Sequence, residues 1–373
     1  MKTKKRARKI MIIIPIALVC VLVVSWIATF IFFNGQTIEK RFNSIAEQKN
    51  IHEAVLFVES DAGDFSVSYG HGGRDIDSLM VIASVTKMFT TACVVMLIED
   101  GQLSLDDKID LYIDDDILNG LHVYKGVDYS RDITISDLLF QTSGLPDYFT
   151  NSDLINNAIF DEDAYISFEQ LIDETKKLAS RFVPNTGRAY YADINFDLLG
   201  VILEKVTELP LEEIYKQYIF KPLGMKNTYL PVGEDDFVPH VYCGSERLEC
   251  PLFIASCRAN GGAVSTARDL MIFSKAFWNG ELFDKAVFGV LSDYERIQFN
   301  PIQYGGGHMR LPLGGLNTFF FASGDLIGHS GSTGSFMFYY PEKDLHFVGD
   351  LAQLEDQGAT IRFAMQLAMV VYT

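Results

Sequence analysis

Apolar runs of different lengths alternate along the chain with polar turns, and each run predicts an element. Residues 10–33 contain no charged side chain, and a helix of that length reaches about 36 Å, enough to cross a bilayer core of about 30 Å. Two short β-prone runs, 55–58 and 65–69, flank the polar turn 61–64 and predict a hairpin. Residues 88–98 are apolar on nearly every face, which is typical of a buried helix.

The remaining pattern predicts how these elements combine. Residues 34–49 indicate a short linker and a helix, residues 101–280 are mostly helical and rich in loops, and the stretch after Tyr304 is β-prone up to a terminal helix at 360–371. The predicted fold class is therefore α+β, with an α/β sandwich lobe. Its antiparallel sheet is built from both ends of the domain and flanked by helices, with a mostly helical lobe inserted at about 101–280.

The N-terminal region predicts a membrane element. Six of the 31 Lys and Arg residues lie within residues 1–9, directly before the uncharged run. By the positive-inside rule, residues 1–9 form a cytoplasmic basic tail and 10–33 a transmembrane signal-anchor. A linker and helix at 34–49 then lead to an extracellular domain at 50–373. The expected location is the cell membrane, with a single pass.

A cleaved signal peptide is the alternative interpretation of the same segment. The apolar core of a signal peptide usually has 7–15 residues and is followed by a site of small residues. The uncharged run at 10–33 is longer, and no A-x-A site follows it. A retained anchor is therefore the favoured hypothesis.

The charge balance argues against nucleic acid as a partner. The net charge is −18, and without the six basic residues of the N-terminus the remainder carries −24. Binding to phosphates requires clustered Lys and Arg. An acidic surface of this kind favours solubility instead.

The five cysteines are too few for a disulfide scaffold. Cys243, Cys250 and Cys257 recur every seven residues, near His240. A zinc site, a Cys243–Cys250 disulfide and unpaired thiols all remain open. No other metal-ligand spacing and no phosphate-binding glycine loop occurs, so no cofactor and no metal are predicted.

The strongest chemical motif is Ser84-Val85-Thr86-Lys87 at the head of the buried helix. Residues three apart share one helical face, so the Lys87 amine can reach the Ser84 hydroxyl. A partly desolvated lysine can act as the base that a serine nucleophile needs. The spacing alone is common in helices, so its meaning depends on the rest of the chain.

Two later motifs supply that context, Tyr190-Tyr191-Ala192-Asp193 and Gly328-His329-Ser330-Gly331, the latter on a predicted strand. A serine–lysine motif, a tyrosine motif and a glycine motif in this order resemble the penicillin-recognising serine hydrolases. The resemblance is to the class C β-lactamase, DD-peptidase and esterase branch. It covers most of residues 50–373, and further segments of similar sequence lie at 83–105, 133–148, 261–270 and 341–343.

The resemblance implies a catalytic role for several residues. Ser84 is expected to form an acyl-enzyme, and Lys87 to take its proton or to hold the charge that lets a partner do so. Tyr191 is expected to be a second proton-transfer group, its phenol acidified by nearby cations. His329 is expected on an edge strand facing the nucleophile, donating to Tyr191 or to a substrate carboxylate. The backbone N–H groups of Ser84 and Ser332 are expected to form the oxyanion hole.

The resemblance also implies a substrate-binding role for Asp193, Ser330 and Gly331, where glycine allows close approach. Asp193 stands where the family usually has an amide. A carboxylate there favours protonated Lys87, which makes Lys87 a weaker base and Tyr191 the more important one. His329 replaces the usual lysine of β-lactamases and is expected to change charge near its ordinary pKa of about 6.5.

These residues together predict a membrane-anchored, extracytoplasmic serine hydrolase. Histidine at position 329 resembles the DD-carboxypeptidases, D-aminopeptidases and esterases of this branch, and the resemblance implies peptidase or esterase activity rather than efficient β-lactamase activity. A D-alanyl peptide of the cell wall is the leading substrate. The expected partners are a small peptide, ester or lactam substrate, and the membrane through the N-terminal helix. A weakly catalytic penicillin-binding or wall-peptide-sensing protein, and a β-lactamase, are the alternatives.

Overall fold

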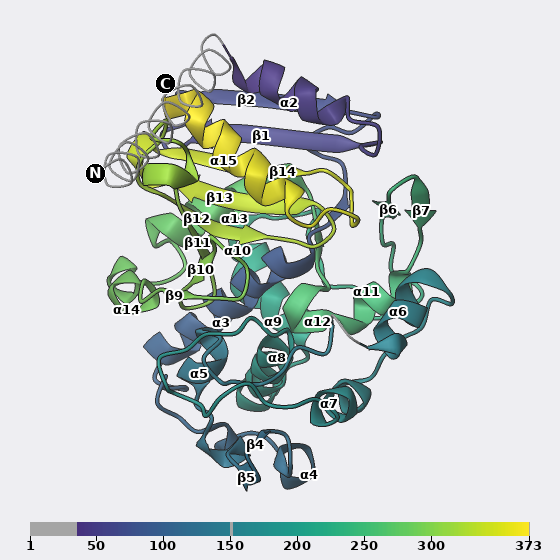
Figure 1. Ribbon diagram of the computed structural model, residues 1–373, viewed down its shortest axis with the longest axis vertical. Helices are drawn as coiled ribbons and strands as arrows, with labels where there is room; N and C mark the ends of the chain where they lie inside the picture. The colour runs from purple at the N-terminus through teal and green to yellow at the C-terminus, as the bar shows by residue number, and fades with distance from the viewer. Residues whose placement is uncertain (1–35, 150–151, 373) are drawn as a thin grey trace, which may run out of the picture.

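The computed structural model describes residues 36–149 and 152–372, and its centre is an antiparallel sheet of eight strands (Figure 1). The strand order is β2-β1-β14-β13-β12-β11-β10-β9. The first two strands, β1 (Ala54–Ser60) and β2 (Ser66–His71), form the predicted hairpin. The other six are β9 (Glu295–Arg296), β10 (Gln303–Tyr304), β11 (Met309–Pro312), β12 (Asp325–Ser330), β13 (Ser335–Tyr340) and β14 (Leu345–Asp350). The prediction that both ends of the domain build one antiparallel sheet is confirmed.

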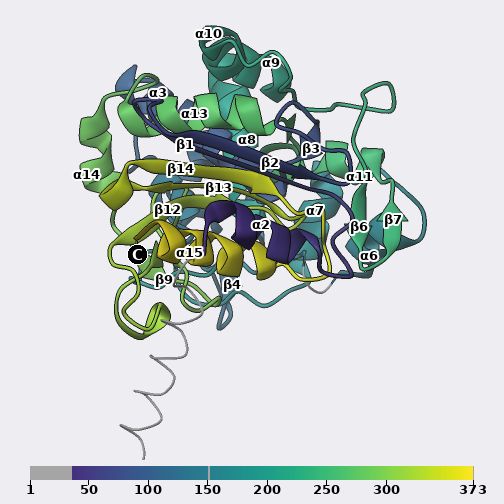
Figure 2. The ribbon, with the colours of Figure 1, turned by 90° about the horizontal axis from the view of Figure 1, so that it is seen from above.

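Helices cover both faces of this sheet (Figure 2). On one face α13 (Ala267–Asn279) packs against β1, β13 and β14. On the other face α15 (Ala359–Tyr372) crosses β12 and β13, and α2 (Ile38–Ala46) lies beside it. The predicted helices at both ends of the domain are confirmed.

Burial along the strands follows from these two layers. Strand β1 lies inside the sheet with helices on both sides, and six of its seven residues are buried. A strand covered on both faces needs a continuous apolar run, which residues 54–58 provide. Strand β2 is the sheet edge and alternates exposed with half-buried residues.

The middle of the chain is mostly helical and packs beside the sheet. Helix α3 (Thr86–Glu99) is buried along almost its whole length, as its apolar sequence predicts. It packs against α8 (Ile194–Thr207) and α12 (Arg258–Gly261). The other helices of this part are α4 (Asp115–Leu118), α5 (Ile135–Leu139), α6 (Asp153–Phe160), α7 (Phe168–Lys176), α9 (Leu211–Tyr215), α10 (Lys221–Leu223) and α11 (Pro251–Ser256), and α14 (Phe288–Leu291) precedes β9.

Three short strand pairs complete the described structure. One of them, β3 (Met80–Val81) with β8 (Val264–Ser265), joins the chain before α3 to the chain after α12. This pair brings the serine–lysine motif beside the end of the helical region. The other two are β4 (Val123–Tyr124) with β5 (Val127–Asp128), and β6 (Val241–Cys243) with β7 (Glu246–Leu248).

Several expectations lie at the margins of the described structure. The basic tail 1–9 and the span 10–33 lie outside the described residues, so the anchor stays a prediction. Within 36–149 and 152–372, no helix combines the length and apolarity needed to cross a bilayer. In this same part of the chain Cys243, Cys250 and Cys257 carry free thiols, and no three ligand side chains cluster as a metal site would require.

Candidate active site

Ser84 lies in a tight 3-10 turn, Ala83–Val85, between β3 and α3. Ala83 has a φ of 42°, a left-handed conformation that costs an alanine about 1–2 kcal/mol. Close packing holds this turn: a Cβ atom on Gly331 would lie 2.5 Å from the Ile82 carbonyl oxygen and 3.0 Å from the Ala83 Cβ. Gly331, directly after β12, therefore lets this part of the chain pack closely against the serine turn.

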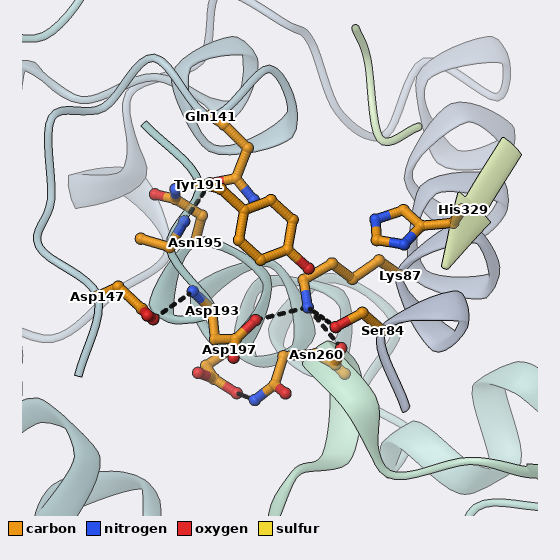
Figure 3. Close-up of polar contacts among 12 residues, drawn as sticks. Ser84, Lys87, Gln141, Asp147, Tyr191, Asp193, Asn195, Asp197, Asn260 and His329 are labelled. Atoms are coloured by element: carbon orange, nitrogen blue, oxygen red, sulfur yellow. Dashed lines mark hydrogen bonds and ion pairs between the residues drawn. The ribbon is translucent and has the colours of Figure 1, made fainter. Parts of the chain in front are cut away.

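Lys87 lies one turn further along and is fully buried. Its Nζ donates to Ser84 Oγ at 3.2 Å, to Asp193 Oδ1 at 2.7 Å and to the Asn260 carbonyl oxygen at 2.7 Å (Figure 3). An ammonium group has three N–H donors. Each has an acceptor here, so in this arrangement the lysine is a charged donor that holds the serine oxygen.

Three buried carboxyl groups lie in the same region as this ammonium. Asp193 precedes α8 and forms the ion pair, and its backbone N–H donates to Asp147 Oδ1 at 3.2 Å. Asp197, on the first turn of α8, accepts from Asn260 Nδ2 at 2.6 Å. Burial raises the pKa of Asp197 to about 7, and burial together with the charge of Asp193 raises the pKa of Asp147 to about 7.

These raised pKa values predict how stability depends on pH. Between about pH 4 and 7, the folded protein keeps protons on Asp147 and Asp197 that the unfolded chain has lost, so the free energy of unfolding falls as pH rises. The slope is at most about 1.4 kcal/mol per pH unit for each group. Melting temperatures across this window are expected to fall less steeply in Asp197→Asn than in the parent. The exposed Asp132→Asn is the matched control and should keep the parent slope.

Tyr191 lies across the cavity floor from Ser84, with its ring centroid 5.1 Å from Lys87 Nζ. The side chain of Gln298 fixes its backbone: Oε1 accepts from the Tyr191 N–H and Nε2 donates to the Tyr191 carbonyl oxygen, each at 2.8 Å. The neighbouring Tyr190 points elsewhere, and its hydroxyl accepts from Arg181.

The expectation of an acidified Tyr191 phenol is wrong. Burial, and then the negative charge of Asp193, raise its pKa well above the ordinary value, and a hydrogen bond with Ser84 offsets only part of this. The nearby charge with the largest effect on this phenol is the negative charge of Asp193, which pairs with Lys87. Tyr191 therefore stays a neutral phenol that can donate a proton.

His329 also differs from its expected role. It lies on β12, which has neighbours on both sides, so it is not on an edge strand, although the pairing with β11 ends at Gly328. Burial, and then the charge of Lys87, lower the pKa of His329 to about 3. The expected change of charge near pH 6.5 is wrong, because the ring is neutral throughout the physiological range.

Two hydrogen bonds define the state of this neutral ring. His329 Nδ1 lies 2.8 Å from the Ser330 carbonyl oxygen, which can only accept, so Nδ1 carries the hydrogen. Nε2 then accepts from the Tyr304 hydroxyl at 3.2 Å. The ring centroid of His329 is 6.1 Å from that of Tyr191. His329 therefore supports the wall behind Tyr191 without offering a charge to a substrate.

The expected oxyanion donors lie on two different elements. The Ser84 N–H is in the first turn of a 3-10 helix, where N–H groups lack partners within the helix. Ser332 follows β12 and lines the same cavity, and its N–H donates to no acceptor among the described residues. Ser330 also lines the cavity, and its hydroxyl contacts the Met309 sulfur at 3.7 Å.

A cavity of about 630 Å³ opens over these groups. Its wall includes Ser84, Asp147, Tyr191 and Asp193, and Arg362 of α15 also lines it. Among the described lining residues, Arg362 is the one basic side chain, and it is paired with Asp356. The cavity is large enough for a small peptide, amide or ester.

Sequence reasoning missed several residues that shape this site. Asn260 supplies an acceptor to Lys87, and Gln141 accepts from the Ala192 N–H at 2.9 Å and from Asn195. Both lie in or beside segments that resemble the family, at 133–148 and next to 261–270, but no chemical motif singled them out. The sequence did not single out Tyr304, because its hydrogen bond with His329 exists only once the sheet has brought their strands together.

The comparison with family models agrees with this geometry. The model described as Beta-lactamase matches residues 47–373, which include every side chain of the site. The chain belongs to the beta-lactamase family. It is therefore a serine hydrolase of this family, as its three motifs predict.

Curated relatives match this beta-lactamase family chain only in part. Protein flp of Staphylococcus aureus (strain MW2) is 29% identical over 185 residues, which are 47% of this chain and 34% of that protein. A penicillin-binding protein of Bacillus subtilis (strain 168) is 27% identical over 274 residues, 66% of this chain and 56% of that protein. The chain thus spans between a third and somewhat more than half of the length of these relatives.

Several solved structures share the fold of this chain. A D-stereospecific amidohydrolase from Streptomyces sp. aligns with a TM-score of 0.72 and 22% identity over 87% of this chain and 96% of that chain. The D-amino acid amidase of Ochrobactrum anthropi SV3 aligns with a TM-score of 0.71 and 21% identity over 90% and 98%. These similarities establish the fold of this chain.

Proposed function

We propose that this chain is a membrane-anchored, extracytoplasmic hydrolase that works through an acyl-enzyme on Ser84. The observation that carries the proposal is the 3.2 Å contact between Ser84 Oγ and Lys87 Nζ beside Tyr191, on the floor of the 630 Å³ cavity. A serine next to an amine and a phenol, with two N–H groups nearby, fits acyl transfer.

The proposed proton path follows the hydrogen bonds. Lys87 first gives a proton to Asp193, 2.7 Å away, and the neutral amine then takes the Ser84 proton as Oγ attacks the substrate carbonyl carbon. The N–H groups of Ser84 and Ser332 stabilise the oxyanion. The neutral phenol of Tyr191 gives a proton to the leaving group and regains one from Lys87. Water then hydrolyses the ester on Ser84.

The proposed substrates are small D-alanyl peptides, related amides and short esters. Two solved structures with this fold are named as a D-stereospecific amidohydrolase and a D-amino acid amidase, which supports an amide of a D-residue as the substrate. Because His329 is neutral, we assign the recognition of a substrate carboxylate to Arg362, which lines the same cavity.

A substrate panel tests this proposal on the full chain. D-Ala-D-Ala peptides, D-amino acid amides, short esters and a chromogenic cephalosporin are offered, with Ser84→Ala as the blank. We expect repeated turnover of at least one peptide, amide or ester, faster than that of the cephalosporin. A single stoichiometric acylation without release would instead assign a penicillin-binding or wall-peptide-sensing role. One observation favours this sensing role: all three N–H groups of the Lys87 ammonium already donate hydrogen bonds, as they would in a lysine that stays charged and is a weak base.

The membrane part of the proposal rests on the sequence of residues 1–33. Protease added to intact cells is expected to remove the domain that begins near residue 34, because the positive-inside rule leaves it outside. Fractionation and mass spectrometry measure this. A domain found in the medium with a new N-terminus near residue 30 would assign a cleaved signal peptide and contradict the anchor.

A further inference from the structure

A loop between β11 and β12 exposes large apolar side chains to solvent. Residues 311–324 contain no charged side chain, although 21% of the chain is charged. Within them Leu316, Phe319 and Phe320 are 67%, 43% and 68% exposed. We call residues 313–324 the aromatic loop. Exposed apolar residues gathered on one segment are typical of a surface that contacts a partner or a membrane.

The backbone of this loop has a defined shape that does not require phenylalanine. Phe319 and Phe320 have φ angles of 51° and 66°, a left-handed conformation that glycine or asparagine adopts more readily. The buried Thr318 hydroxyl accepts from the Ala322 N–H at 3.2 Å and so closes the turn. The turn could form with smaller residues at its tip, which indicates that the two aromatic side chains serve a purpose at the surface.

The aromatic loop is hydrogen-bonded to the C-terminal end of α15. The Ser323 hydroxyl donates to the Tyr372 hydroxyl at 2.8 Å, and Tyr372 itself is 39% exposed. The Lys343 ammonium lies over the Tyr372 ring, 4.7 Å from its centroid. Exposed aromatic rings, a tyrosine and a lysine thus lie together at this end of the molecule.

The described chain begins at the same end. Helix α2 runs antiparallel to α15 in both views, so its first residues lie near the C-terminus (Figures 1 and 2). The guanidinium of Arg41 donates to Gln366 Oε1 at 2.9 Å, and Gln366 is about 9 Å along the helix from Tyr372. Residue 36, where the uncharged run 10–33 has just ended, therefore lies close to the base of the aromatic loop.

We propose that the aromatic loop dips into the outer surface of the lipid bilayer, with Leu316, Phe319 and Phe320 among the lipid headgroups and upper acyl chains. This inference rests on the membrane anchor proposed above. A chain that leaves the membrane near residue 34 brings this face within reach of the lipid. Aromatic side chains favour the membrane interface, and a nearby lysine favours anionic headgroups.

Docking of the aromatic loop would fix the distance between the cavity and the membrane surface. The cavity is lined by Ile361, Arg362 and Met365 of α15, whereas the opposite end of the same helix holds the aromatic loop. Ile361 and Tyr372 are eleven positions apart, or about 16 Å along a helix. The proposal therefore holds the active site at a fixed height above the lipid.

Tryptophan quenching by brominated lipid tests the proposal on the full chain. The natural tryptophans are Trp26, in the run 10–33, and Trp278, which is buried. In a Trp26→Phe background, Phe320→Trp is compared with Phe237→Trp, whose parent side chain is similarly exposed at 65%. Both are reconstituted in vesicles of phosphatidylcholine and phosphatidylglycerol with and without brominated acyl chains. We expect strong quenching in Phe320→Trp and none in Phe237→Trp beyond that of the background.

The readouts separate the failure of the docking from the failure of the anchor. Flotation of the vesicles reports the anchor, independently of quenching. If the Phe320→Trp variant floats but is unquenched, or is quenched no more than Phe237→Trp, the docking is overturned. Leu316→Trp, at an equally exposed position, repeats the test if Phe320→Trp misfolds. A dimer that is lost in Phe320→Ser would assign the loop to a second copy of the chain and also overturn the proposal.

Discussion

Replacing Ser84 by alanine is expected to lower hydrolysis and covalent labelling by a fluorophosphonate at least about 10³-fold, because the nucleophile of acyl transfer is removed. The fold should remain intact. The Ser84 hydroxyl is one of three acceptors for Lys87, and the other two, Asp193 and Asn260, are unchanged. Intact-protein mass spectrometry of the labelled chain, with a melting curve, measures both effects.

Ser332→Ala is the matched control for this experiment. Ser332 lines the same cavity, and its expected contribution is a backbone N–H that alanine keeps. Labelling should therefore remain within a few-fold of the parent. Labelling that persists in Ser84→Ala at another serine, located by peptide mapping, would contradict the assignment of the nucleophile.

The fold was predictable where local pattern decides it. The hairpin of β1 and β2, the buried helix α3 and the terminal helix α15 each follow from apolar spacing over neighbouring residues. The same pattern predicted that strands from both ends share one sheet, but it could not give their order, in which β1 pairs with β14. Such pairing depends on which apolar faces meet, and sequence spacing does not report that.

The positions of the site residues were easier to predict than their charge states. Motif spacing brought together Ser84, Lys87 and Tyr191, and the structure places them around one cavity. The pKa shifts of Tyr191 and His329 went against expectation because burial dominates both. Desolvation disfavours the charged form whatever the residue, and the degree to which a side chain is desolvated in the fold cannot be read from a motif.

The carboxyl groups near Lys87 illustrate the same limit. Asp193 was predicted to lie beside the lysine from its place in the tyrosine motif, and the structure confirms this contact. Asp197 lies only one helical turn further on, yet its importance depends on Asn260, which comes from a segment 63 positions away. Contacts between distant segments were therefore missed.

Replacing Lys87 by methionine, which has a similar shape and no charge, is expected to lower labelling of Ser84 at least about 10²-fold, because the proton acceptor is lost. The same change should destabilise the fold by about 3–5 kcal/mol, since it leaves a carboxylate without its partner in a buried site. The carboxylate of Asp193, whose charge already raises the pKa of Asp147, would then lack its paired cation. Labelling rates per folded molecule and chemical denaturation measure the two effects separately.

A second buried ion pair in this chain provides the control. Arg74 is bonded to Glu53 and Asp350 and does not line the cavity. Arg74→Met should destabilise the fold by a similar amount and leave the labelling rate per folded molecule unchanged. Equal loss of labelling in both variants would mean that Lys87 acts only through stability.

The double variant Lys87→Met with Asp193→Asn separates the two roles of the lysine. Removing the carboxylate together with its partner should recover much of the lost stability, because no unpaired charge remains. Labelling should stay low, because an amide at position 193 cannot replace the amine that receives the serine proton. Recovery of labelling along with stability would instead assign proton transfer to another group, with Tyr191 the nearest candidate.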